Sequence, residues 1–198
     1  MYIIAGTHKG RKLQSPPAGL CRPSKGIVRE ALFNILTSGR YDNVVENAHV
    51  LDVCAGTGAL ALEALSRGAS AATLLEKNPQ IAAIAKANIQ KLNEASRATV
   101  VQHDVLRLPF APQPASLVFI DPPYQNNLLP QILASLAQKQ WLQPNALIVI
   151  ETSARDTVSL ATEFIVAESR RYGKTELHFF HYKPIDVSME EEEIAVYS

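Results

Sequence analysis

The amino-acid sequence predicts an α/β protein built on a doubly wound, largely parallel sheet. From His49 onward, short apolar runs typical of buried strands alternate with longer stretches of helical periodicity. A glycine turn, AGTG, directly follows the first of these runs and opens the first helix of the alternating region. The chain has 198 residues, of which 47% are hydrophobic, so it is long enough for one domain with a full core.

The first 40 residues are predicted to form a small extension made of a hairpin and a helix. Two β-rich runs, YIIA and RKLQ, flank the turn sequence GTHKG. Ser24 is a suitable N-cap for the helix that follows. Arg29 and Phe33 stand four residues apart on the flank of its apolar stripe. The stripe consists of Val28, Ala31, Leu32, Ile35 and Leu36.

The alternating region is predicted to contain five strands joined by helices, followed by a hairpin. Asn78 and Pro79 open one helix, as its N-cap and its first-turn proline. Two β-rich runs on either side of Tyr172-Gly173-Lys174 indicate an antiparallel hairpin at the edge of the sheet. The predicted strands span residues 49–54, 71–76, 98–103, 115–120 and 146–151, and the predicted helices span residues 58–68, 79–92 and 127–138.

The net charge is zero, but the charges are distributed unevenly. Residues 1–40 contain seven Lys or Arg and one acid, whereas residues 185–198 contain five acids and no base. We expect the first segment to be an arm that binds a polyanion, residues 41–184 to be the α/β domain, and residues 185–198 to be a disordered, solubilising tail. The candidates for contacts with this polyanion are Lys9, Arg11, Lys12, Arg22 and Arg29, and the alternative for Arg29 is a structural role that anchors the helix to the domain.

The composition argues against a membrane protein and against a disulfide-stabilised one. No apolar run approaches the roughly 20 residues that span a bilayer. The N-terminus lacks the basic and apolar segments of a signal peptide. Cys21 and Cys54 lie in different sequence contexts, so no disulfide framework is expected. We expect a cytoplasmic location and no metal site.

The glycine turn fits two kinds of cofactor. Gly56, Gly58 and Ala61 give the G-x-G-x-x-A pattern of NAD-dependent dehydrogenases, so that function is one alternative, and a glycine turn without a ligand is another. Asp52 lies four residues before Gly56. Its carboxylate would repel a pyrophosphate but attract the ammonium or sulfonium group of S-adenosylmethionine.

Two further acids favour S-adenosylmethionine. Glu76 ends the second strand and, as a group that only accepts hydrogen bonds, suits two ribose hydroxyls. Asp104 follows the third strand and can accept a hydrogen bond from the amine of adenine. These acids are expected at the carboxyl ends of neighbouring strands, where open α/β sheets bind ligands. Lys77 and Val105, their neighbours in the sequence, complete the predicted cofactor site.

The fourth strand, in the sequence VFIDPPY, ends in a carboxylate, two prolines and an aromatic ring. The exocyclic amine of a nucleobase is a poor nucleophile, because its lone pair is delocalised into the ring. Asp121 and the carbonyl of Pro122, held extended by Pro123, can accept the two N–H bonds of the amine and aim its lone pair at a methyl group. Tyr124 can stack on a flipped base, a contact worth about 1–3 kcal/mol. These four are the predicted catalytic residues.

Three stretches together carry a family resemblance. RPSKGIVREALFNIL, LDVCAGTGALALEALSRGA and VFIDPPY, in this order and spacing, resemble the RsmD-type 16S ribosomal RNA guanine methyltransferases, and the similarity runs from about residue 2 to residue 183. The resemblance implies a seven-stranded, Rossmann-like sheet and methylation of the 2-amino group of guanine 966, with the assembled small ribosomal subunit as substrate. Gly26 stands where the family usually has an aspartate. Carried over to this sequence, the cofactor residues are Asp52, Gly56, Gly58, Glu76 and Asp104, and the base-binding residues are Asp121 to Tyr124.

Other functions remain open. Adenine methyltransferases carry the same DPPY motif, although the basic arm favours the ribosomal alternative. A protein glutamine methyltransferase would be expected to have Asn in place of Asp121. A ribosome-binding module with an inactive cofactor fold would not need the acids or the DPPY motif. We expect a monomeric enzyme whose partner is 16S ribosomal RNA.

Overall fold

The fold comes from a computed structural model that describes residues 1–16, 26–122 and 128–184. Ser24, the predicted N-cap of the first helix, lies outside these residues. In the described part, no helix is both long enough and apolar enough to cross a membrane. The elements are α1 (Gly26–Leu36), β1 (His49–Val53), α2 (Ala59–Ser66), β2 (Ala71–Leu75), α3 (Pro79–Lys91), β3 (Ala98–Val101), the 3-10 helix η1 (Val105–Arg107), β4 (Ala115–Ile120), α4 (Leu129–Gln138), β5 (Leu142–Ser153), β6 (Phe164–Tyr172) and β7 (Thr175–Tyr182).

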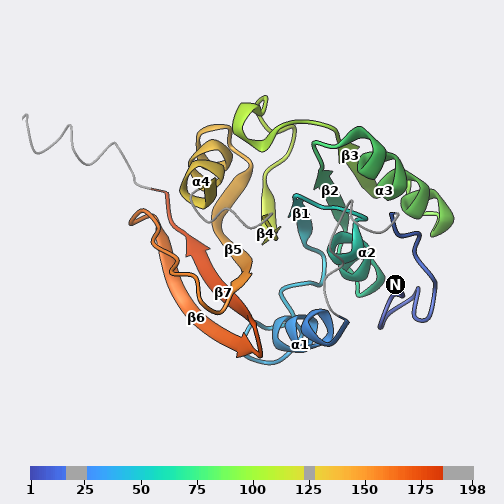
Figure 1. The fold of residues 1–198 in the computed structure, drawn as a ribbon, viewed down its shortest axis with the longest axis horizontal. Coiled ribbons are helices and arrows are strands. Elements are labelled where there is room, and N and C mark those ends of the chain that lie inside the picture. Colours follow the sequence, from blue (N-terminus) through green and yellow to red (C-terminus); the bar gives the residue numbers. More distant parts are fainter. Residues whose placement is uncertain (17–25, 123–127, 185–198) are drawn as a thin grey trace, which may run out of the picture.

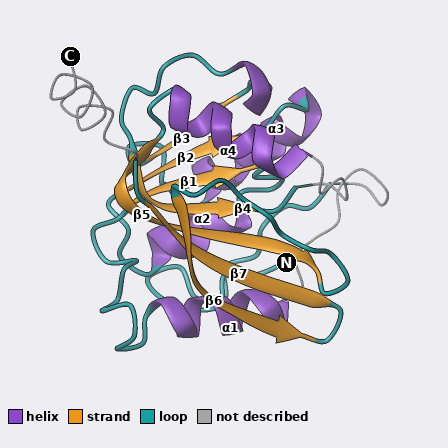
Figure 2. Ribbon diagram, turned by 90° about the vertical axis from the view of Figure 1, so that its left-hand side faces the viewer, coloured by secondary structure: helices purple, strands orange, loops and turns teal. Residues whose placement is uncertain are grey.

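The seven strands form one sheet in the order β3-β2-β1-β4-β5-β7-β6 (Figure 2). The first five strands pair in parallel, which confirms the predicted parallel sheet. The last two form the predicted antiparallel hairpin, and β7 pairs with β5, so that β6 becomes the edge strand. β5 begins four residues before its predicted start at residue 146, and the register shifts between Ala115 and Leu117 on its partner strand β4.

Helices cover both faces of the sheet, which confirms the doubly wound arrangement (Figure 1). Val50 and Phe119 face a core shared with α1, α2 and α3. Leu51 and Ile120 face the opposite core, which is shared with α4. Because successive side chains of a strand point to opposite faces, the apolar runs of β1 and β4 supply both cores.

The start of α3 follows the prediction from Asn78 and Pro79. The side chain of Asn78 accepts hydrogen bonds from the backbone N–H groups of Gln80 and Ile81 at 2.9 and 3.3 Å. Pro79 occupies the first turn, where its missing N–H costs no hydrogen bond. The helix therefore begins three residues after Glu76, which follows the carboxyl end of β2.

The N-terminal residues pack into the main core. An antiparallel bridge joins Tyr2 to Lys12, in agreement with the predicted hairpin. Ile3 and Leu13 are buried in the same core as Phe33 of α1, whose ring centroid lies 5.7 Å from that of Phe119 in β4. Residue 40, where we placed the end of the arm, therefore does not separate two hydrophobic cores.

Candidate functional site

The sheet brings the predicted acids together at the carboxyl ends of its parallel strands. Val53 of β1 lies opposite Leu75 of β2 and Ile120 of β4, and β3 ends beside β2. Burial first, and then the charges of four acids, raise the pKa of the thiol of Cys54, the residue after β1, to about 12. Cys54 is therefore a neutral thiol, and four carboxyl groups are near enough to this edge of the sheet to affect its pKa. The four acids are Glu76, Asp121, Asp52 and Asp104.

The glycine loop runs from the end of β1 to the start of α2 in left-handed backbone geometry. Cys54, Gly56 and Gly58 have φ angles of 60, 57 and 78°. A Cβ atom on Gly58 would lie 2.5 Å from a methyl carbon of Leu74, so this position requires glycine for space as well as for conformation. The backbone N–H of Gly56 points to Glu76, to which it donates a 3.0 Å hydrogen bond.

Glu76 occupies the centre of the predicted cofactor site. Its Oε2 accepts the hydrogen bond from Gly56, and its Oε1 accepts a 2.8 Å hydrogen bond from the backbone N–H of Asn78. The side chain is partly exposed. A carboxylate has about four acceptor positions, so each oxygen retains capacity for a hydroxyl donor. This arrangement suits two neighbouring hydroxyl groups, as on a ribose.

Asp52 is placed differently from its predicted role as a direct partner of a cationic group. Its side chain is 2% exposed, and Oδ2 accepts a 3.1 Å hydrogen bond from the backbone N–H of Ala61 in α2. Burial raises the pKa of Asp52 well above its usual range, with Asp121 and Glu76 adding to the effect and the Ala61 hydrogen bond opposing it. Asp52 therefore holds the start of α2 in this arrangement.

Asp104 and Lys77 form an ion pair at the rim of the site. Lys77 Nζ lies 2.8 Å from Asp104 Oδ2, and Asp104 Oδ1 accepts a hydrogen bond from the backbone N–H of Leu106. The hydrogen bond from Lys77 is the main cause of the lowered pKa of Asp104. An adenine amine would share this carboxylate with Lys77, whose side chain is 75% exposed. Val105 is partly buried, and its side chain packs against the core that α4 shares with the sheet.

The predicted base-binding motif begins beside these acids. Asp121 and Pro122 follow β4 directly and are partly buried. Asp121 is close enough to Asp52 and to Cys54 to raise the pKa of both. Pro123 and Tyr124 lie outside the described residues. Within the described part of the chain, no group of three or more His, Cys, Asp or Glu side chains could hold a metal ion.

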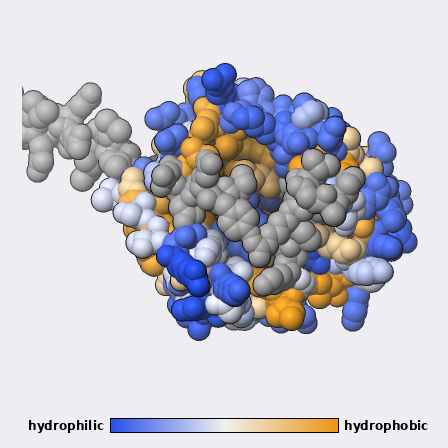
Figure 3. Space-filling view, viewed as in Figure 1, coloured by the Kyte–Doolittle hydropathy of each residue, from blue (hydrophilic) through white to orange (hydrophobic). Residues whose placement is uncertain are grey.

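Three of the five predicted RNA contacts are exposed on the N-terminal hairpin. Lys9, Arg11 and Lys12 point to the surface. The Nη2 atom of Arg11 donates a 3.4 Å hydrogen bond to the carbonyl of Lys91, at the end of α3. Arg22 lies outside the described residues. Figure 3 shows hydrophilic side chains around much of the rim of the face viewed in Figure 1.

Of the two roles expected for Arg29, the structure supports that of a structural anchor and not that of an RNA contact, because α1 buries this side chain. It is 2% exposed, its Nη2 donates a 2.5 Å hydrogen bond to the carbonyl of Tyr2, and its Nε lies 3.8 Å from Glu63. Glu63 is fully buried and also accepts hydrogen bonds from the backbone N–H groups of Ile4 and Ala5 and from Arg67. Arg29 is therefore a structural residue that holds the hairpin to α2. The sequence signal was the single acid in the apolar helix ALALEALS, which needs a buried cationic partner.

Sequence reasoning also missed Asn88. Its side chain is completely buried in α3, where it contacts both the N-terminal segment and the glycine loop. The available signal was its spacing, because Asn88 lies three residues after the buried Ala85 and shares a helix face with it.

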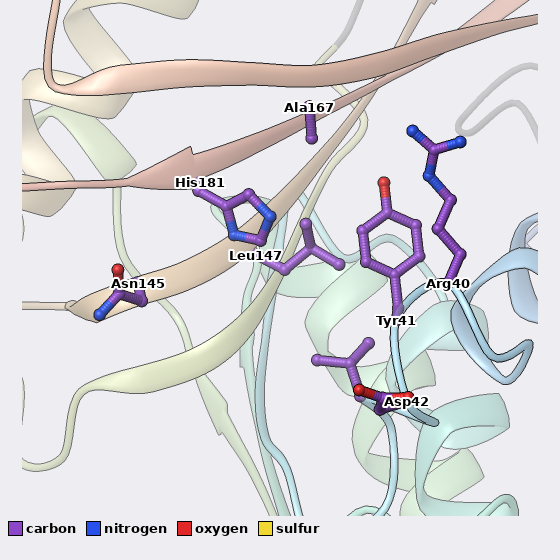
Figure 4. Close-up of a pocket in the computed structure, with 8 residues that line it drawn as sticks. Arg40, Tyr41, Asp42, Asn145, Leu147, Ala167 and His181 are labelled. Atoms are coloured by element: carbon purple, nitrogen blue, oxygen red, sulfur yellow. The ribbon is translucent and has the colours of Figure 1, made fainter.

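A separate pocket lies away from these residues. It has a volume of about 360 Å³, and Figure 4 shows Arg40 and Tyr41 extending toward the strands that carry Ala167 and His181. The hydroxyl of Tyr41 donates a 2.9 Å hydrogen bond to Glu168, and burial raises the pKa of Tyr41 to about 12. None of the predicted site residues lines this pocket.

The chain is similar to several known methyltransferases. A family model described as "Conserved hypothetical protein 95" matches residues 1–181. Ribosomal RNA small subunit methyltransferase D of Haemophilus influenzae is 39% identical over 154 residues, which are 76% of this chain and 77% of that protein. The protein of the same name from Escherichia coli K12 is 36% identical, over 78% of this chain and 75% of that protein.

Solved structures agree with the observed fold. A putative methyltransferase from Escherichia coli has a TM-score of 0.81 at 31% sequence identity, covering 93% of this chain and 99% of that one. An RNA methyltransferase from Salinibacter ruber, in complex with S-adenosyl-L-homocysteine, has a TM-score of 0.64 at 12% identity, covering 84% of this chain and 97% of that one. At 12% identity the likeness concerns the fold alone.

Proposed function

The chain belongs to the family of ribosomal RNA small subunit methyltransferase D, and we propose that it methylates the 2-amino group of a guanine in 16S ribosomal RNA. It is an S-adenosylmethionine-dependent ribosomal RNA methyltransferase. The proposal of a guanine amine as the methyl acceptor rests on the position of Asp121 and Pro122. These residues directly follow β4, next to the end of β1 and among the acids that raise the pKa of Cys54. An acceptor for an amine thus adjoins the cofactor site.

The described residues fit S-adenosylmethionine. Glu76 has acceptor capacity for the two ribose hydroxyls and is held in place by Gly56 and Asn78. The carboxyl groups near Cys54 favour the ammonium and sulfonium groups of this cofactor, whereas they disfavour the pyrophosphate of NAD. When bound, the cofactor supplies an electrophilic methyl group on its sulfonium. Lys77 and Asp104 then form the rim on the adenine side.

The protein's part in the reaction is to orient the amine. The carboxylate of Asp121 and the carbonyl of Pro122 accept hydrogen bonds from the two N–H groups of the guanine amine. This draws the nitrogen toward tetrahedral geometry, so that its lone pair points to the methyl carbon. Bound S-adenosylmethionine would supply the methyl group, and its sulfur would accept the electron pair of the broken C–S bond. The extra proton on nitrogen then passes to water, so Asp121 need not bind it. Tyr124, by its place in the motif, stacks on the flipped base.

The basic hairpin supports an RNA substrate larger than a free nucleotide. Lys9, Arg11 and Lys12 lie on an N-terminal segment that packs against α2 and α3. Glu76 belongs to the loop between β2 and α3, so α3 adjoins the proposed cofactor site and also contacts the arm. Phosphate contacts by the hairpin would position ribosomal RNA while the end of β4 binds the base.

The test uses small ribosomal subunits from a strain that lacks the gene. Tritiated methyl from S-adenosylmethionine should enter 16S ribosomal RNA of these subunits, and primer extension should stop at one guanine. A parallel reaction with protein-free 16S ribosomal RNA shows whether naked RNA accepts the methyl group as well as the assembled subunit does. Subunits from the parent strain, in which the guanine is already methylated, should accept no label. Label in adenine, or in duplex DNA alone, would contradict the proposal.

A further inference from the structure

Asn88 joins three segments that are distant in the sequence. Its Oδ1 accepts a 2.7 Å hydrogen bond from the backbone N–H of Gln14. Its Nδ2 donates to the carbonyl of Gln14 at 3.1 Å and to the carbonyl of Thr57 at 3.0 Å. The side chain is completely buried, and its bond to Thr57 is buried on both sides, which strengthens it. One amide thus connects the N-terminal segment to α3 and to the glycine loop.

Thr57 is the middle residue of the Gly56-Thr57-Gly58 turn. On one side of the turn, Gly56 donates to Glu76, and on the other side the carbonyl of Thr57 accepts from Asn88. The Thr57 hydroxyl also lies 3.9 Å from the sulfur of Met1, as a second contact with the N-terminal segment. Cys54 has a left-handed φ angle that is unfavourable for a non-glycine residue, and Gly56 and Gly58 are free to adopt other conformations, so neighbouring groups must hold the loop. Asn88 is a buried polar group that holds the glycine loop through Thr57 while it is bonded to the N-terminal segment.

The hairpin has other anchors that do not touch the glycine loop. Glu63 accepts hydrogen bonds from Ile4 and Ala5, and Ser66 Oγ accepts one from the backbone N–H of His8. These anchors fasten the hairpin to α2. The contacts of Gln14 differ from these anchors, because the Asn88 side chain that bonds Gln14 also donates a hydrogen bond to the carbonyl of Thr57 in the glycine loop.

We propose that Asn88 is a positioning residue that couples docking of the N-terminal segment to cofactor binding. When the Gln14 backbone is docked, the Asn88 amide is oriented to hold the Thr57 carbonyl, and the glycine loop keeps its binding conformation. By linkage, the cofactor strengthens docking of the arm by the same factor. The inference rests on S-adenosylmethionine binding at this loop and not on which RNA base is methylated.

A double-mutant cycle tests the coupling in the full-length protein. Gln14→Pro removes the N–H that donates to Asn88, and Asn88→Ala removes the amide. The measured quantity is the dissociation constant of S-adenosylhomocysteine, determined by calorimetry for the wild type, both single variants and the double variant. Gln14→Pro should weaken binding by about fivefold in the wild type and by less than about twofold when Asn88 is already Ala. Equal factors in both backgrounds would overturn the proposal.

Two control variants separate coupling from general loss of stability. Ser66→Ala removes one of the anchors between the hairpin and α2. Gln90→Ala changes an exposed residue of α3, the helix that contains Asn88. Both should leave the affinity within about twofold of the wild type, even where Ser66→Ala lowers the urea midpoint. If Ser66→Ala weakens binding as much as Gln14→Pro at a similar loss of stability, Asn88 has no specific coupling role.

A second measurement does not depend on the Asn88→Ala variant being folded. The N–H of Gly58 donates a 2.8 Å hydrogen bond to the carbonyl of Ala55 within the loop. In ligand-free Gln14→Pro, amide hydrogen exchange at Gly58 should be at least severalfold faster than in the wild type, while exchange in β4 is unchanged. An unchanged rate at Gly58 would show that the loop does not sense Gln14, and would overturn the proposal.

Discussion

Glu76 accepts a 3.0 Å hydrogen bond from the backbone N–H of Gly56, which ties the end of β2 to the glycine loop after β1. The other carboxylate oxygen accepts from Asn78 at the start of α3. One side chain therefore fixes the two loops that border the proposed cofactor site. A change at Glu76 alters the shape of the site as well as its contacts.

Glu76→Gln should weaken S-adenosylhomocysteine binding by about 1–3 kcal/mol, the range expected when a hydrogen bond to a charged group is removed. The amide cannot accept with both of its ends, so its nitrogen would face the N–H of either Gly56 or Asn78. Calorimetry measures the affinity, with Glu30→Gln at an exposed position of α1 as the matched control. Unchanged affinity in Glu76→Gln, or tight NAD binding by the wild type, would falsify this role.

Asp121→Ala should lower the rate of methyl transfer about 10²–10³-fold, as expected when one preorganised polar group beside the reacting atoms is removed. The affinity for S-adenosylhomocysteine should change little, because the proposed contact of Asp121 is with the base and not with the cofactor. Single-turnover transfer to small ribosomal subunits separates the chemical step from product release. A rate within a few-fold of the wild type would exclude Asp121 as the group that orients the amine.

Removing exposed charges from the hairpin should make subunit binding less sensitive to salt. In a Lys9→Ala/Lys12→Ala double variant, the log–log slope of affinity against salt should flatten by about 2, or about 1 for each phosphate that is no longer neutralised. Lys174→Ala, in the β6–β7 turn, is the matched control at an exposed lysine. A slope equal to that of the wild type, with normal cofactor affinity, would place the RNA elsewhere on the protein.

Arg29→Met should destabilise the fold without changing that slope. Removing one partner of a buried ion pair costs about 3–5 kcal/mol, and we expect a value near 3 because Glu63 keeps Arg67 and two backbone donors. Urea unfolding measures the change in stability, with exposed Arg11→Met for comparison. A stability equal to that of Arg11→Met would mean that Arg29 is not an anchor of the hairpin.

Asp52 should make the stability of the ligand-free protein depend on pH. Burial raises its pKa in the folded state, so the folded state binds this proton more tightly than the unfolded state does. Wild-type stability should therefore decrease, relative to Asp52→Asn, as pH rises from about 4 to the raised pKa of the folded protein. The asparagine retains an oxygen for the N–H of Ala61. Urea unfolding at several pH values between about 5 and 8 measures the difference, and a constant difference would contradict the raised pKa.

The order of the elements could be predicted from the sequence because each strand carries its own local signals. The acids at residues 76, 104 and 121 each follow an apolar run, and parallel pairing alone places them at one edge. The N-cap at Asn78 is likewise local, since its two donors lie within three residues. For such features, neighbouring residues determine the structure.

The surroundings that helical spacing and motifs left undetermined depend on distant partners. Helical spacing placed Arg29 on the flank of α1, but its burial follows from Glu63 in α2 and the carbonyl of Tyr2. Asp52 points to the face that α2 covers, like Val50 two residues earlier, although the motif suggested a ligand contact. In both cases the deciding group lies on another element.

The position of β7 between β5 and β6 links completion of the sheet to late steps of protein synthesis. β5 pairs on one side with β4, and its other side pairs with β7 from Leu147 to Ser153. Until residues 175–182 leave the ribosome, that side of β5 is an unpaired edge, and β6 has no strand beside which to fold. A nascent chain that stalls after Tyr172 would expose the apolar run Leu147–Ile150 to chaperones and to other unfinished chains. The sheet is therefore completed only once the last strand of the described chain has been synthesised.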